Sequence, residues 1–563
     1  MRKLFSKKLL SVLLASSMVI GSASALTGCG SKKNEVIKLN VYSQLANFSG
    51  KQIGWSADIL KKKFNVELNI IPEGDGVFET RMTSGNLGDI VVWGADNDKY
   101  PLAVKNNLLF GWEDDNVLDE YGPYIKKNMP DALKKNKELT KTITNGASDK
   151  LYGFGANVAL NSKDHESFFY TWDTRWDLYK KLGYPKIKNL QDYHKMLKNM
   201  QKLCPSDDSG NKVYAVSLWP DWDDAMVMYV KAMATAYYGY DELALGLYDP
   251  TNGKYHDALE EKGPYLEMLK WFNDLYQDGL IDPDSMTQTY DEMIAKVQNG
   301  GTLFSIFNYS GSLGYNTKEH TSAGKLMYCM KPEDASPIVY GMNTQGGDRV
   351  WSIGAKTEYP EKCMEIINYL ATPEGRMTKG YTWDYDDQKH AYLTDVGVKC
   401  QNDKNTTMGG GYKGSYHDGE LQINNVTWSL DASNPDSDGE TYNKESWASY
   451  NATPSSDIEK DWRDKTGCTT INEYMEKGKY TVAPGTSFSK ETQDTTLKTT
   501  WNQVTTEIKN SSWKAIYAKS DKQFDSVVAG MKKSAKKYGY DKCVEWSRNQ
   551  ASRRKALEDA ITR

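Results

Sequence analysis

An almost uninterrupted apolar run near the start of the chain constrains the fold most. Residues 89–93 read DIVVW, and a run this short and this apolar is typical of a strand buried on both faces, as in parallel sheets. Two alternating segments precede it, at 36–42 and 66–71, and helical patterns occur at 55–64 and 101–107. This β-α-β-β-α order predicts an α/β fold whose ligands bind near the carboxyl ends of the strands.

The size and charge of the chain set further limits. A chain of 563 residues exceeds what one compact core supports, so we expect two large lobes. The formal net charge is −5 and basic residues form no run, which disfavours nucleic-acid binding. Residues 381–456 are rich in Gly, Asp, Asn and Tyr with little periodicity, and predict long loops. Six cysteines beyond residue 29 are widely spaced, so disulfides and buried free thiols both remain open.

The N-terminal segment is built like a secretory signal. Positive residues open it, and an apolar stretch at 9–20 follows that is too short to span a bilayer comfortably. The tetrapeptide Leu26-Thr27-Gly28-Cys29 resembles the bacterial lipobox, in which the signal is cut before the cysteine and the cysteine is lipidated. We therefore expect residues 1–28 to be a signal peptide and Cys29 to carry the lipid, palmitate included. Residues 29–35 would tether the protein to the extracellular side of the cell membrane. The alternatives are a chance cysteine or a retained membrane anchor.

Five segments along the chain share the motifs of one protein family. They are residues 84–93 (SGNLGDIVVW), 107–110 (NLLF), 149–154 (DKLYGF), 172–184 (WDTRWDLYKKLGY) and 359–375 (YPEKCMEIINYLATPEG). In this order they resemble the extracellular solute-binding lipoproteins (family 1 type) that serve carbohydrate ABC importers. Gly88 stands where the family has proline, and the acid that usually precedes the tryptophan at 176 is missing.

The resemblance implies a two-lobe clamp of the periplasmic-binding-protein type (type II), with the ligand cleft between the lobes. Lobe 1 would comprise residues 36–156 plus about 338–385, and lobe 2 residues 157–337 plus about 386–563. Such a monomer would capture an extracellular carbohydrate, most naturally an oligosaccharide, and deliver it to the transmembrane subunits of an ABC permease. Closure would follow from the higher affinity of the closed form for ligand.

Sugars present apolar CH faces and a rim of hydroxyls, so their sites combine aromatic rings with amides or carboxylates. Residues that meet this description follow or occupy predicted strand ends: Tyr42, Gln44, Asn47, Trp93, Asp96, Trp219, Trp222, Asn308, Tyr309, Trp351 and Trp383. In related sugar-binding proteins the loop after the 89–93 strand carries ligand contacts, so the resemblance points to Trp93 and Asp96. Packing in a core is the alternative for every tryptophan in this set.

Catalysis and metal binding have weaker support. The chain has no G-x-S-x-G elbow and no phosphate-binding loop, and its six histidines are scattered, so we expect no enzyme and no required cofactor. The spacing of Asn434, Asp436, Asp438 and Glu445 fits a calcium loop except for the first residue, against a plain solvated loop as the alternative. A secreted carbohydrate-active enzyme, and a receptor or sensor for peptides or other small solutes, are the competing functions.

Overall fold

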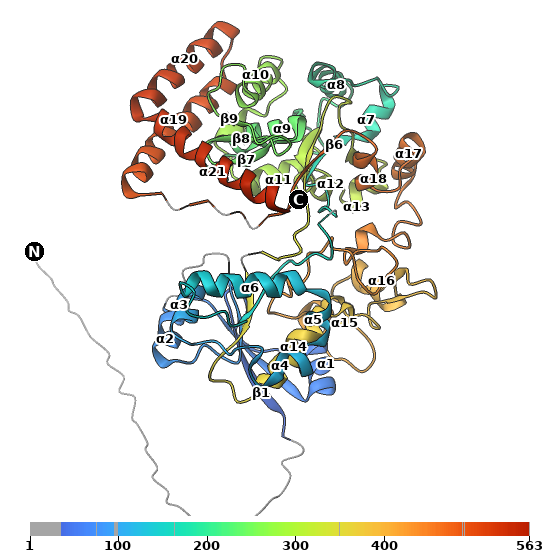
Figure 1. Ribbon diagram of the computed structural model, residues 1–563. Helices are drawn as coiled ribbons and strands as arrows, with labels where there is room; N and C mark the ends of the chain where they lie inside the picture. Colours follow the sequence, from blue (N-terminus) through green and yellow to red (C-terminus); the bar gives the residue numbers. More distant parts are fainter. Residues whose placement is uncertain are drawn as a thin grey trace, which may run out of the picture.

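The computed structural model describes residues 35–561 apart from residues 75, 95–98, 163, 348, 487, 489 and 492. The chain forms two lobes, one above the other in Figure 1. Elements from the first 155 residues build one lobe together with a later segment, and the helices at the C-terminal end lie in the other. Among the described helices, none combines the length and apolarity needed to cross a membrane.

A six-stranded sheet forms the centre of the first lobe, in the order β2-β3-β1-β4-β13-β5. β1 pairs in parallel with β3 and β4, and β13 pairs antiparallel with β4 and β5. The bounds are β1 (Ile37–Ser43), β2 (Gly50–Lys51), β3 (Val66–Pro72), β4 (Ile90–Val92), β5 (Gly153–Gly155) and β13 (Val350–Ile353). The three strands predicted from the first hundred residues are therefore confirmed as β1, β3 and β4.

Helices cover both faces of this sheet. Successive residues of each strand point to opposite sides, so an apolar strand presents side chains to both faces. Ile90 and Val92 enter one core, whereas Val91 and Trp93 enter the other. The helices are α1 (Gly54–Phe64), α2 (Val77–Ser84), α3 (Lys99–Lys105), α4 (Val117–Tyr121), α5 (Pro123–Asn128), α6 (Pro130–Ile143), α14 (Pro360–Ala371) and α15 (Pro373–Met377).

The second lobe is mainly helical around a small antiparallel sheet in the order β10-β6-β11. Its strands are β6 (Tyr170–Arg175), β7 (Asp241–Leu243), β8 (Gly246–Tyr248), β9 (Tyr255–Asp257), β10 (Phe304–Phe307), β11 (Met327–Cys329), β12 (Ile338–Tyr340) and β16 (Thr481–Ala483). Its helices are α7 (Trp176–Lys181), α8 (Leu190–Leu203), α9 (Met228–Tyr238), α10 (Pro264–Gln277), α11 (Tyr290–Gln298), α12 (Ser312–Tyr315), α13 (Lys318–Ser322), α17 (Asp457–Thr466), α18 (Ile471–Glu476), α19 (Thr495–Ile516), α20 (Asp521–Tyr538) and α21 (Tyr540–Ile561).

The chain passes between the lobes three times, at about residues 156–169, 341–349 and 448–456. The first two connections run side by side and share backbone hydrogen bonds. Ala159 N–H donates to Asn343 O at 3.0 Å, and Met342 N–H donates to Asp164 O at 2.8 Å. These bonds hold the two connections together as one strip.

Residues 386–447 belong to the first lobe, which corrects their assignment to lobe 2. This stretch is mostly irregular, with β14 (Trp383–Tyr385), β15 (Ala391–Leu393) and α16 (Asp395–Asn402) as its regular elements nearby. Trp428 and Tyr442 lie in the core under the six-stranded sheet, and the Trp428 indole donates to Ala371 O at 2.7 Å. A segment without periodicity carries no sign of which core it joins, so the sequence could not place it.

A buried charge cluster attaches α21 to the rest of the second lobe. The Arg554 guanidinium donates to Asp241 at 2.5 Å and to Glu558 at 2.9 Å. Tyr248 donates to the other oxygen of Glu558 at 2.6 Å. The Arg554 side chain is only 10% exposed, so removing it would take a buried counter-charge away from Asp241 and Glu558.

We expect Arg554→Ala to lower the free energy of unfolding by about 3–5 kcal/mol, the usual cost of breaking one partner of a buried ion pair. Urea denaturation followed by circular dichroism measures this change. Arg548→Ala is the matched control, because Arg548 is 61% exposed beside Asp257 and a surface pair is worth about 0–1 kcal/mol. Equal effects of the two substitutions would contradict a buried network.

Candidate functional site

A group of aromatic side chains forms an exposed surface on the second lobe. The Trp222 ring stacks on Tyr290 with centroids 4.5 Å apart, and Tyr309 lies 5.8 Å from Trp222. Phe169 extends the group at 5.8 Å from Tyr309. Trp222 is 48% exposed and Phe169 is 43% exposed. Side chains this apolar and this exposed, gathered in one place, mark an interaction surface.

Buried rings hold this aromatic surface in place. Trp219 meets Trp222 edge-on at 5.5 Å, and Phe307 stacks under Tyr309 at 5.0 Å. Trp219 and Phe307 are buried in the core of the second lobe. Because packed rings have few alternative rotamers, the exposed rings above them are fixed before any ligand arrives.

The N-termini of two helices complete the surface. Tyr290 begins α11, where its backbone N–H donates to the Asp221 carboxylate at 2.8 Å. Ser312 begins α12, where its N–H donates to Asp173 at 2.5 Å. Both helices lie on the side of the second lobe that faces the first (Figure 1). The aromatic surface therefore faces the first lobe.

Asp173 is an acid buried under this surface on β6, and one of its oxygens has no hydrogen-bond partner. Burial raises the pKa of Asp173 to about 6, although the Ser312 contacts oppose the rise. Aspartate in water has a pKa of about 3.9. The charged form is therefore disfavoured in the folded protein.

The first lobe contributes a polar cluster at the carboxyl ends of β1 and β3. The Tyr42 hydroxyl donates to the Glu73 carboxylate, and Lys99 donates to Glu73 Oε2 at 2.8 Å. Gln44 Nε2 lies 3.3 Å from Glu73 Oε2, and Gln44 Oε1 accepts from Gly94 N–H at 2.6 Å. Lys99 begins α3, on the side of the first lobe that faces the second (Figure 1).

The Glu73 carboxylate of this polar cluster stays ionised at neutral pH. Partial burial would raise the pKa of Glu73, but hydrogen bonds from Lys99, Tyr42 and the Gly74 backbone outweigh it and lower the pKa. Burial and the Glu73 carboxylate both raise the pKa of the Tyr42 phenol. The cluster thus offers a carboxylate, an ammonium and an amide, which together bind hydroxyl groups as donors and as acceptors.

The two surfaces are complementary in chemistry. One lobe presents aromatic faces and the other presents hydrogen-bonding groups. A ligand with apolar faces and a polar rim, large enough to touch both lobes, would meet both requirements.

No protein-family model matches the chain, and no curated protein matches it by sequence. Solved structures do match it. An HMO-binding, ABC-transporter-associated solute-binding protein from Bifidobacterium longum infantis gives a TM-score of 0.53 at 12% identity, over 93% of this chain and 99% of that one. An extracellular solute-binding protein from Bifidobacterium longum subsp. infantis gives 0.53 at 12% identity, over 92% and 98%. An EF-hand mutant of the S. pneumoniae ABC-transporter substrate-binding protein FusA, in complex with fructo-nystose, gives 0.50 at 14% identity, over 92% and 99%.

The chain has the fold of the extracellular solute-binding proteins. The match extends over nearly the whole length of each neighbour, so it includes both lobes and their connections. The predicted α/β two-lobe clamp is therefore confirmed.

Some of the site residues predicted from the sequence of this chain lie together in the structure. Trp222 and Tyr309 form the aromatic surface, with Trp219 beneath them and Asn308 beside Tyr309 at the end of β10. Tyr42 and Gln44 take part in the polar cluster of the first lobe. Asn47 is exposed, and no contact joins it to that cluster among the described residues. Asp96 and Cys29 lie outside the described residues.

Five of the predicted aromatic site residues are buried and cannot stack on a ligand, which corrects their assignment: Tyr42 and Trp219, described above, and Trp93, Trp351 and Trp383. Trp93 and Trp351 are fully buried, and Trp383 packs against Trp447 at 5.3 Å with its indole donating to Met377 O. A ring without an exposed face cannot stack on a ligand. For Trp93 the reason is the alternation of β4, which directs this side chain under α2 and α3.

Sequence reasoning missed four side chains of the two surfaces. Glu73 directly follows β3, so the strand-end rule that selected Gln44 also applies to it. Tyr290 is marked by the capping box that Thr289 and Glu292 form at the start of α11. Phe169 and Lys99 carry no such signal, because only the tertiary fold brings them to the surfaces.

The candidate calcium loop shows no metal cluster. The Asn434 amide oxygen accepts from Asp436 N–H at 3.0 Å, and its nitrogen donates to Tyr385. Across the described part of the chain, no group of three or more His, Cys, Asp or Glu side chains is placed to hold a metal ion. The six described cysteines are free thiols.

We expect Asp173→Asn to stabilise the protein at pH 7. The pKa of Asp173 is higher in the folded protein than in the unfolded chain, so its contribution to stability is present below about pH 4 and is lost as the pH rises through about 6. A difference of about two pKa units corresponds to about 3 kcal/mol at most. Thermal unfolding of both proteins between pH 4 and pH 8 measures this trend, and the gain should shrink towards pH 4.

Asp278→Asn is the control of opposite sign. Lys198 and His194 lower the pKa of Asp278, so this substitution should reduce stability at pH 7. An Asp173→Asn protein that is less stable than the wild type at pH 7 would contradict the assignment.

Proposed function

We propose that the protein is the substrate-binding component of an ABC importer and captures an extracellular oligosaccharide between its lobes. The observation that carries this proposal is the exposed aromatic surface of Trp222, Tyr290, Tyr309 and Phe169. Aromatic rings stack on the CH faces of sugars, and several adjacent rings suit several adjacent sugar units. The fold neighbours that are titled as binding HMO and as bound to fructo-nystose support a carbohydrate.

The polar cluster of Glu73, Gln44 and Lys99 would supply hydrogen bonds to the hydroxyls from the opposite lobe. A ligand that touches both lobes stabilises the closed arrangement by its higher affinity for it. The permease can then recognise the closed lobes. No bond is made or broken in this process, and binding requires no cofactor. The loop at residues 434–445 stays a candidate for a structural calcium ion.

Trp222→Ala should weaken oligosaccharide binding at least tenfold, because it removes the central ring of the surface. Titration calorimetry and tryptophan fluorescence across a panel of neutral oligosaccharides measure the affinity. Tyr538→Ala is the matched control, since Tyr538 is an exposed aromatic residue at the end of α20, and it should leave the affinity unchanged.

Equal affinities of the Trp222→Ala and wild-type proteins would remove this surface as the site. Chromatography of the glycans after incubation separates the two classes of function. Shortened products would favour a secreted carbohydrate-active enzyme, whereas unchanged glycans bound by the protein favour the receptor. Binding of peptides in place of glycans would favour the other receptor class.

We further propose that residues 1–28 are removed and that Cys29 is lipidated, which anchors the protein as a monomer on the outer face of the cell membrane. The lipobox-like sequence from Leu26 to Cys29 supports this proposal. In cells fed labelled palmitate, the wild type should carry the label and sediment with membranes. Cys29→Ala should lose the label, and Cys204→Ala, which changes a half-buried thiol of the body, should keep it. Label on the Cys29→Ala protein would contradict the anchor.

A further inference from the structure

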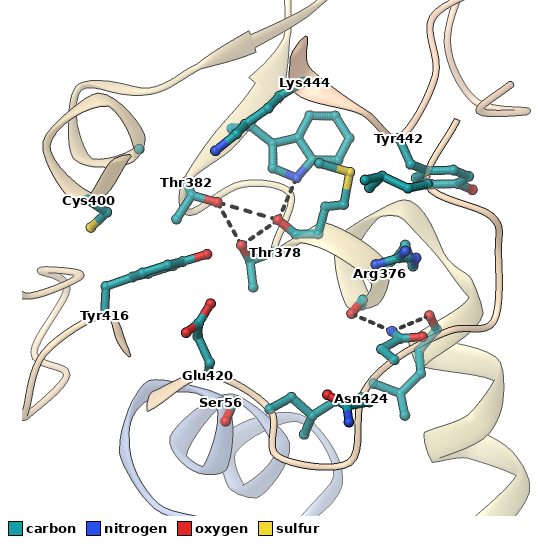
Figure 2. Close-up of a pocket in the computed structure, with 18 of the residues that line it drawn as sticks. Ser56, Arg376, Thr378, Thr382, Cys400, Tyr416, Glu420, Asn424, Tyr442 and Lys444 are labelled. Atoms are coloured by element: carbon teal, nitrogen blue, oxygen red, sulfur yellow. Dashed lines mark hydrogen bonds between the residues drawn. The ribbon is translucent and has the colours of Figure 1, made fainter. Parts of the chain in front are cut away.

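A cavity of about 840 Å³ lies inside the first lobe, away from the aromatic surface. Its walls come from α1, from α14 and α15, and from the irregular segment up to Trp447 (Figure 2). Apart from Arg349, which ends the second connection between the lobes, every residue that lines it belongs to the first lobe. Its volume falls in the range of about 300–1,000 Å³ that holds small-molecule ligands.

Four cationic residues line this cavity, namely Arg349, Arg376, Lys404 and Lys444, and two of them are drawn on different walls. Figure 2 shows Arg376 on one wall and Lys444 on another. Arg376 touches Trp428 O at 3.4 Å through one terminal nitrogen. Within the part of the chain that the structure describes, no carboxylate lies within ion-pair distance of either side chain.

Burial is the main influence on both Arg376 and Lys444. It lowers the pKa of the Arg376 guanidinium and the pKa of the Lys444 ammonium. A guanidinium nevertheless stays charged at neutral pH. A buried charge without a partner is costly, and folded proteins compensate such charges with counter-charges or ligands.

Four residues of the cavity wall carry a polar atom that is buried and has no hydrogen-bond partner. These atoms are Arg376 Nε, Gln401 Oε1, Ser56 Oγ and the Tyr442 hydroxyl oxygen. Buried polar groups are nearly always hydrogen-bonded, so unpaired polar atoms in the wall of this cavity fit a polar occupant better than an apolar one. The set includes both donors and acceptors, which matches hydroxyl groups as well as an anion.

The walls also contain several aromatic rings and two acids, Glu420 and Glu445. Tyr416 stacks on Trp55 at 5.6 Å and borders the cavity. Glu420 stands on the same side, where its carboxylate lies 3.0 Å from His417. A carboxylate facing two cations across the cavity can accept from ligand hydroxyls at the end away from the anionic group.

We propose that this cavity is a second binding site, which takes a small hydroxylated molecule bearing one oxyanion, a carboxylate or a phosphate. Arg376 and Lys444 hold the oxyanion, since a guanidinium fork matches its geometry. The amide of Gln401 and the hydroxyl of Ser56 bind the hydroxyl groups. This site goes beyond the proposed function, because it lies within one lobe and needs no ligand between the lobes.

Calorimetric titration of the purified protein with glucuronate, glucose 6-phosphate, glucose and sulfate tests the site. We expect glucuronate or glucose 6-phosphate to bind, and the comparison of the two shows whether a carboxylate or a phosphate is preferred. Glucose should bind at least tenfold more weakly than the preferred acid. Arg376→Gln and Lys444→Gln should each weaken binding of the preferred acid at least tenfold. Lys413→Gln is the matched control, because Lys413 is an exposed cation of the same segment that does not line the cavity.

Absence of binding by both acids, or equal binding by the wild type and both variants, would overturn the proposal. Sulfate that binds as tightly as the sugar acids would overturn the role of the hydroxyl groups. Should Arg376→Gln fail to fold, Lys444→Gln carries the test alone. Trp222→Ala should leave acid binding unchanged, and Arg376→Gln should leave oligosaccharide binding unchanged, so the failure of either site is recognised separately.

Discussion

The pairing of β13 with β4 and β5 determines the course of the chain. Strand β13 is more than two hundred residues from β4 in the sequence, yet Trp351 and Ser352 pair with Val92 and Val91. The first sheet is therefore complete only after the chain has built most of the second lobe and returned. This return places the connections at 156–169 and 341–349 beside each other, between the two lobes.

Tryptophan serves opposite purposes in the two lobes. In the first lobe Trp93 and Trp351 fill the space between the sheet and its helices, where their contribution is apolar burial. In the second lobe Trp219 is buried in the same way, but its role is to support Trp222, which stays exposed. A large ring on the surface is retained at some risk of aggregation, so its exposure points to a ligand.

Regular elements with clear periodicity could be predicted from the sequence. The apolar run at 89–93, the alternation of β1 and β3, and the helical pattern at 55–64 all agree with the structure because local pattern and tertiary environment coincide there. Residues 386–447 could not be placed, since irregular backbone joins a core through single side chains such as Trp428. The position of Trp93 at a strand end suggested that its ring is exposed to ligand. Both faces of that strand are covered, so the ring is buried. A place at a strand end therefore does not distinguish an aromatic ring that contacts ligand from one that packs in the core.

The paired connections between the lobes have a mechanical consequence. Two backbone segments that are hydrogen-bonded along their length, as at Ala159 with Asn343 and Met342 with Asp164, form a short ribbon. A ribbon bends readily across its flat face but resists twisting and sliding, because those motions break the hydrogen bonds between its strands. The two connections therefore favour bending between the lobes over twisting of one lobe against the other. If the lobes close on a ligand as proposed, this ribbon would bring their two surfaces together in one alignment.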